Sequence, residues 1–247
     1  MQQAVRALTA AIVLAVVSEP VAAGTRRSSP HDPAARGLAF FEGSEADGGE
    51  ALIARLRPSA LSPALRAAVV AALPPEGELE PTAAERAKIA ALDPIFAFHE
   101  RQGLVVIKVI EVGHAFVGLH ARSVLLLSRD ALSAVDAEEL QALVAHELGH
   151  ELFWDEYQEA RARGAHDVTR ELELRCDGVA VATLRRLGRG PEDLVGGVVK
   201  MTRHNEAIGA TASAPNYVSI KKRRQFIRDV TALFGASGNR AVSRRTP

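Results

Sequence analysis

The five residues HELGH, at positions 146–150, constrain this chain more than any other feature of its sequence. They follow Asp136, a good helix N-cap, and Glu139, which completes the spacing of a capping box. The stretch is therefore expected to be a helix. His146 and His150 are four residues apart, so both imidazoles project from one face of that helix, one turn apart, where they can bind one zinc ion.

Two other residues of the motif have expected roles. Glu147 points to the flank of the histidine pair, so it can serve as a general base without binding the metal. Gly149 leaves space where another element could approach closely. The alternative is an ordinary helix that matches the motif by chance, and a third metal ligand is needed to decide between the two.

A histidine at 153 or 156 would suit a ligand from the loop after the motif, but these positions hold phenylalanine and glutamate, so the metzincin pattern is absent. A second predicted helix, RELELRCDGVAVATLRRLG, presents Glu173 and Asp177 at i and i+4, on one face. Glu173 can be the third ligand, while Asp177 accepts the outer N–H of a zinc histidine. Glu171 is the competing ligand, but its i+4 neighbour is Arg175, which cannot accept that bond. Without HELGH, this segment would be interpreted as a solvated, charged helix face.

Composition restricts the class of protein. The chain has 247 residues, of which 47% are apolar and 24% charged, which favours a single globular domain. Thirty basic residues balance thirty acidic ones, so we expect no nucleic-acid partner. The single cysteine, Cys176, cannot form an internal disulfide and is expected to be a small buried thiol.

The N-terminal residues 1–23 have the pattern of a signal peptide. Arg6 precedes the apolar run ALTAAIVLAVVS, and Val21-Ala22-Ala23 offers small residues for cleavage before Gly24. The run is shorter than the ~20 apolar residues that span a bilayer. We therefore expect a periplasmic or secreted protein with no permanent membrane span after cleavage, or a membrane-associated one if the signal is retained.

The rest of the chain divides by pattern. Residues 24–50 are expected to be a flexible tether or surface wrap, 51–235 the folded domain, and 236–247 a flexible tail. The domain should contain two short helices over 50–72 and a longer one from Thr82 to about Glu100. GLVVIKVIEV and SVLLLSR are expected to be strands. The sequence thus predicts an α+β, mostly helical domain with a small sheet.

HELGH, followed by ELRCDGVA and preceded by LSRDALSAVDAEELQALVA, resembles the gluzincin zinc metallopeptidases of the HtpX and CAAX prenyl endopeptidase family, whose mark is HExxH with a later ExxxD. The resemblance covers roughly residues 82–235. It implies a zincin-like domain, one zinc per chain on His146, His150 and Glu173, Glu147 as catalytic base, and Asp177 as the support of a ligand.

The sequence departs from that family at three points. His114 stands where an asparagine precedes Ala-Phe along the substrate cleft. Tyr217 begins a segment that lacks the family's His-Pro pair, although Arg223 can keep a supporting role beside the ligand glutamate. The family's several membrane spans are also absent. His114, Tyr217 and His120 can contact substrate or an oxyanion, but a structural role is favoured for each.

These features predict a zinc-dependent metalloendopeptidase that cleaves peptides or proteins of the envelope or exterior. The segment SVLLLSR is expected to form the edge of the cleft, where an extended peptide pairs with the main chain. Two alternatives remain: a zinc-stabilised binding module or chaperone with little turnover, and a cell-wall amide hydrolase. A structural site would not need Glu147, whereas the missing histidine at Tyr217 favours the binding module.

Overall fold

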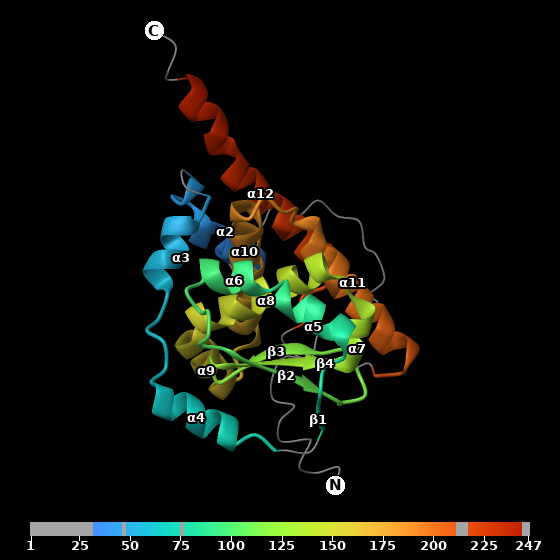
Figure 1. Ribbon diagram of the computed structural model, residues 1–247. Helices are drawn as coiled ribbons and strands as arrows, with labels where there is room; N and C mark the ends of the chain where they lie inside the picture. Colours follow the sequence, from blue (N-terminus) through green and yellow to red (C-terminus); the bar gives the residue numbers. More distant parts are fainter. Residues whose placement is uncertain (1–31, 46–47, 75–76, 211–216, 244–247) are drawn as a thin grey trace.

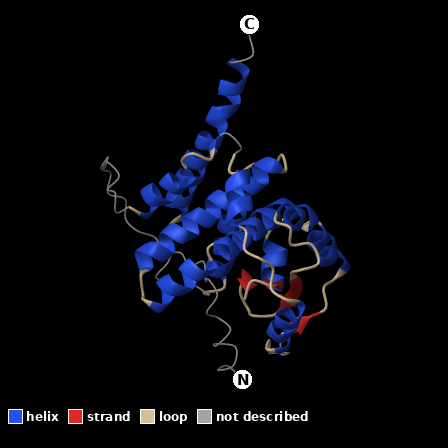
Figure 2. Ribbon diagram, turned by 90° about the vertical axis from the view of Figure 1, so that its left-hand side faces the viewer, coloured by secondary structure: helices blue, strands red, loops and turns tan. Residues whose placement is uncertain are grey.

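The computed structural model describes residues 32–45, 48–74, 77–210 and 217–243. It is mostly helical with one small mixed sheet, which confirms the α+β class (Figure 1, Figure 2). The predicted signal peptide, residues 1–23, lies outside the described residues. No helix within the described ranges has the length and apolar character needed to cross a membrane.

In chain order the described helices are α2 (Pro33–Phe41), α3 (Glu50–Leu56), α4 (Pro63–Ala71), α5 (Ala83–Ala90), α6 (Asp93–Phe98), α7 (Arg129–Ala134), α8 (Ala137–Leu152), α9 (Trp154–Ala162), α10 (His166–Arg186), α11 (Glu192–Ala207) and α12 (Ile220–Ser243). Most of the described helices pack around a common core on one side of the sheet, whereas α4 lies on the other side, where it packs against a smaller apolar cluster (Figure 1).

The sheet consists of β1 (Glu78–Leu79), β2 (Val106–Ile110), β3 (Val117–His120) and β4 (Val124–Ser128), in the order β1-β2-β4-β3. The strands predicted in GLVVIKVIEV and SVLLLSR are confirmed as β2 and β4. β4 pairs with β2 in parallel and with β3 antiparallel, so both of its edges are occupied. The prediction that SVLLLSR forms a cleft edge is therefore wrong, because the edge strand beside α8 is β3.

The helix predicted from Thr82 to about Glu100 is interrupted. Thr82 caps α5 with Glu85 in a capping box, but the chain turns at residues 91–92 and α6 begins at Asp93. Pro94 in the first turn of α6 explains the break, since proline lacks the N–H that a continuous helix would need there. The two short helices predicted over 50–72 are confirmed as α3 and α4.

The expected flexible segments are more ordered than their composition suggests. Within residues 24–50, Asp32 caps α2, whose Phe41 is fully buried. A Cβ added at Gly178 of α10 would lie 2.2 Å from the Phe41 ring, so this glycine makes room for α2. From Pro33 onward the segment is thus part of the packed domain, contrary to the prediction. Similarly, α12 continues through Ser243, into the predicted tail 236–247.

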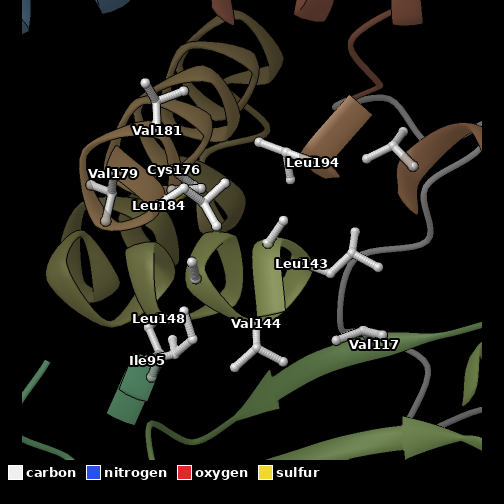
Figure 3. Close-up of a cluster of buried hydrophobic side chains, with 14 of the residues drawn as sticks. Ile95, Val117, Leu143, Val144, Leu148, Cys176, Val179, Val181, Leu184 and Leu194 are labelled. Carbon is white, nitrogen blue, oxygen red and sulfur yellow. The ribbon is translucent and has the colours of Figure 1, made fainter. Parts of the chain in front are cut away.

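The helix α8, which carries HELGH, runs through the interior. Its predicted capping box between Asp136 and Glu139 is confirmed, and every residue from 139 to 151 is buried. Val144 faces the sheet, where β3 carries Val117, whereas Cys176 of α10 lies on the other side of the helix (Figure 3). A helix that is buried on all sides needs packing partners on all sides, and the sheet and α10 provide them.

At Gly149, α8 and α10 approach each other closely. A Cβ built there would lie 2.9 Å from the Cα and 3.0 Å from the Cβ of Cys176. The first of these is a backbone atom, which no side-chain rotation can move away. Gly149 thus does what the sequence predicted, and its partner is α10.

We expect Gly149→Ala to force the two helices apart and to destabilise the fold by about 1–3 kcal/mol. Gly235→Ala is the matched control, because Gly235 is exposed on α12 with no atom within 4 Å of an added Cβ. That change should stabilise the protein slightly, by up to ~1 kcal/mol. Urea unfolding of both variants tests this, and a Gly149→Ala protein as stable as wild type would refute the close packing.

A second prediction concerns His99, which is buried and lies 2.9 Å from the Thr183 hydroxyl through its Nε2. Burial, together with Arg57 and Arg101, lowers the pKa of His99 from 6.5 to about 3. Between these two values the unfolded chain binds a proton that the folded chain does not. Above pH 6.5, His99 is neutral in both states and the free energy of unfolding is unaffected by its burial. As the pH falls from 6.5 toward 3, protonation of His99 in the unfolded chain lowers the free energy of unfolding.

His99→Gln keeps an N–H donor but does not titrate. Its free energy of unfolding should depend less on pH than that of wild type between about pH 4 and 6.5. Urea titrations at several pH values measure this dependence. If the free energy of unfolding changes equally with pH in the two proteins, His99 does not contribute to acid sensitivity.

Candidate metal centre

The two histidines of HELGH point their rings into the same small volume beside α10. The ring centroids of His146 and His150 are 5.0 Å apart. Their Nε2 atoms are buried and, among the described residues, neither has a hydrogen-bond partner. Donor atoms of His146, Glu147 and His150 all lie within 4.8 Å of one another. Two unpartnered imidazole nitrogens in one buried place fit a metal ion better than they fit a packed core.

Glu173 of α10 brings a carboxylate to the same place. Its Oε2 lies 3.6 Å from the Nε2 of His146, and its Oε1 lies 3.9 Å from the Nε2 of His150. Ligands held ~2.0–2.1 Å from a tetrahedral zinc are ~3.4 Å apart, so small adjustments would complete a three-ligand set. The residues present thus fit a zinc ion.

Asp177 and Arg223 support two of the candidate ligands, His146 and Glu173, through hydrogen bonds. The Nδ1–H of His146 donates to Asp177 Oδ1 at 2.8 Å, which leaves Nε2 as the nitrogen that faces the site. Arg223, from α12, donates to Asp177 Oδ1 at 2.6 Å and to Glu173 Oε2 at 3.0 Å. One guanidinium therefore fixes both carboxylates of α10, and it is itself buried.

Glu147 lies between the histidine pair and the sheet. Its Oε2 accepts a hydrogen bond of 3.1 Å from the main-chain N–H of Leu119, in the edge strand β3. Burial raises the pKa of Glu147 to about 7, even though the nearby His146 acts to lower it. The hydrogen bond from Leu119 thus holds the Glu147 carboxyl group close to the two histidines.

The other ionisable groups of the centre interact strongly with one another. Burial lowers the pKa of His146, but the hydrogen bond to Asp177 and the nearby Glu173 carboxylate outweigh it and raise the pKa to about 9. Burial lowers the pKa of His150 to about 3. Burial also raises the pKa of Glu173, but the interactions with His146, His150 and Arg223 bring it down to about 2.

The charges of the centre match a divalent cation. Glu147, Glu173 and Asp177 are three buried carboxyl groups, and Arg223 supplies one positive charge. A histidine that binds a metal must be a neutral imidazole, and in that state, with the carboxyl groups ionised, two negative charges would be left over. A dication would balance these two charges, and uncompensated buried charges are expensive.

The competing ligand, Glu171, lies elsewhere. Its carboxylate pairs with Arg36 of α2 and with Arg175, one turn along α10. The structure thus places Glu173, and not Glu171, beside the histidines. Cys176 is buried, as expected, with its sulfur 3.5 Å from the Nδ1 of His150, the nitrogen on the outer side of that ring.

The structure does not bring the weaker candidates to the centre. His114 contacts the carbonyl oxygen of Val112 at 3.1 Å and the ring of Phe116. Tyr217 is partly buried at the start of the segment that leads into α12, and burial raises the pKa of its phenol. Within the described ranges, no hydrogen bond or ion pair joins either residue to the histidine pair. A role for them in substrate contact stays a prediction.

One residue of the centre was missed by the sequence interpretation. Tyr157, on α9, is buried and donates a hydrogen bond of 3.2 Å to Glu173 Oε1. Its ring also packs edge-on against that of His150, at 5.1 Å. The only signal was its position seven residues after His150, but the chain leaves α8 at Leu152, so helical spacing does not apply.

We expect the purified protein to bind about one zinc ion per chain. His146→Ala or His150→Ala should abolish binding, and Glu173→Ala should weaken it severely. Asp177→Asn should weaken affinity or activity ~10- to 100-fold with the fold intact. Glu171→Ala is the matched control on the same helix and should bind zinc like wild type. Metal analysis after dialysis checks this, and full zinc content in one of the three alanine variants would remove that residue from the ligand set.

Comparison with known proteins does not assign the chain to a family. No protein-family model matches it, and a search of curated proteins found no match.

Proposed function

We propose that this protein is a zinc-dependent metalloendopeptidase of the gluzincin type, related to the HtpX and CAAX prenyl endopeptidase family. The observation that carries the proposal is the convergence of the unpartnered His146 and His150 nitrogens with a buried carboxylate from a second helix. Glu147 adds a second carboxyl group in the same place, which a purely structural site would not need.

His146, His150 and Glu173 would hold the metal, and Asp177 with Arg223 would keep two of these ligands in position. A zinc ion in this place supplies Lewis-acid polarisation of a carbonyl group and makes a water molecule easier to deprotonate. Glu147 takes the proton of the attacking water and passes it to the leaving amine. Its hydrogen bond from Leu119 N–H orients the carboxyl group for this transfer.

The edge strand supports a peptide or protein as substrate. β3 is paired on one side with β4, no strand of the described residues pairs with its other side, and the strand contacts α8. The N–H of Leu119 points to Glu147, so the unpaired side of β3 faces the candidate base. An extended peptide can add to such an edge through main-chain hydrogen bonds, which places its carbonyl groups near the metal ligands.

The signal-peptide pattern of residues 1–23 supports an exported location, in the periplasm or outside the cell. Substrates are then expected among envelope or exported proteins, and no nucleic-acid partner is proposed. Membrane association would follow if the signal is retained.

A second candidate is a zinc-stabilised binding module or chaperone with little turnover. The observation in its favour is Tyr217, which stands where the resembling family has a histidine that contacts the reaction intermediate. A phenol can donate a hydrogen bond, but it cannot carry the positive charge that a histidine can.

The decisive variant is Glu147→Gln. Glutamine has nearly the same shape but cannot accept and return a proton, so hydrolysis of an unfolded, casein-like protein should fall ~10²- to 10⁴-fold. Zinc content and the unfolding midpoint should remain near wild type. Glu138→Gln, an exposed position on the same helix, is the control and should retain activity.

Undiminished hydrolysis by Glu147→Gln would exclude it as the base. If wild type binds zinc tightly yet hydrolyses no protein, peptide or cell-wall substrate, the binding module replaces the peptidase.

A further inference from the structure

Tyr157 bridges two of the candidate ligands from a third helix. Its hydroxyl donates to Glu173 Oε1 at 3.2 Å, and its ring packs edge-on against His150, with an interplanar angle of 79°. It is 6% exposed. A buried phenol needs a hydrogen-bond partner, but the partner here is the carboxylate of the metal site itself.

The two oxygens of Glu173 have different donors. Oε2 accepts from Arg223 at 3.0 Å, and Oε1 accepts from Tyr157. The carboxylate is therefore held at both ends, from α12 and from α9. Rotation of the group about its last bond would break one of these hydrogen bonds, so its orientation toward the histidines is fixed.

We infer that Tyr157 is a positioning residue that restricts Glu173 to binding the metal through a single oxygen. A carboxylate can bind a metal through one oxygen or through both. If both oxygens bound, the second would take the position that a catalytic zinc keeps open for water. The Tyr157 hydroxyl engages lone-pair density on Oε1 and favours the single-oxygen mode, in which the site has three protein ligands and an open position.

This inference rests on the proposed metal site but not on peptidase activity, so metal binding alone can test it. Cobalt(II) replaces zinc in such sites and has visible absorption bands whose intensity falls as the coordination number rises from four to five. The wild-type cobalt protein should give the intense spectrum of a four-coordinate centre. A weak, five-coordinate spectrum in the wild type would overturn the inference without any variant.

Tyr157→Phe removes the hydroxyl and keeps the ring that packs on His150. We expect weaker cobalt bands, because Glu173 can then bind through both oxygens, and a zinc affinity lowered ~10- to 100-fold in competition with a chelator. Tyr217→Phe makes the same chemical change at the chain's other tyrosine and should leave both quantities at the wild-type value.

A purely structural role makes a different prediction. In that case Tyr157→Phe would lower the unfolding midpoint of the metal-free protein while the cobalt spectrum and the zinc affinity stayed as in wild type. That result would overturn the inference and leave the proposed function intact. If the wild-type protein binds neither cobalt nor zinc, the proposed function itself fails.

Discussion

The candidate metal centre depends on the close crossing of α8 and α10 at Gly149. With the backbone of Cys176 against that glycine, the helix that carries His146 and His150 lies directly beside the helix that carries Glu173 and Asp177. A side chain at position 149 would separate the two pairs. The chemistry of the site thus depends on a steric fact about one residue that has no side chain.

The crossing also brings several ionisable side chains together in the interior, and residues from two other helices form hydrogen bonds with them. Arg223 reaches the two carboxylates of α10 from α12, and Tyr157 reaches one of them from α9. Charges in a protein interior persist only when partners compensate for them. A divalent cation would complete this compensation, so metal binding and stability are expected to be linked.

The sequence predicted those parts of the fold and the site that depend on local spacing. The capping box at Asp136, the facing histidines, and the i and i+4 pair of Glu173 and Asp177 follow from the geometry of a helix alone. The strand β3 could not be predicted in the same way, because its hairpin turns at Ala121 and Arg122, both with positive φ, without the usual glycine or asparagine.

Contacts between distant segments could not be predicted from the sequence either. The helix α2 is stabilised by Phe41 fitting against Gly178, a pairing across more than a hundred residues that no local pattern encodes. The contact of Tyr157 with Glu173 was unpredictable for the same reason, since it forms only after the chain has turned at the end of α8.

The most direct test of the account is a crystal structure of the zinc-soaked protein with anomalous data at the zinc edge. We expect one peak, ~2.0–2.1 Å from the Nε2 atoms of His146 and His150 and at a similar distance from one oxygen of Glu173. Glu147 should lie near the metal but outside its ligands. A peak elsewhere, no peak, or a zinc ion bound by Glu147 in place of Glu173 would contradict the account.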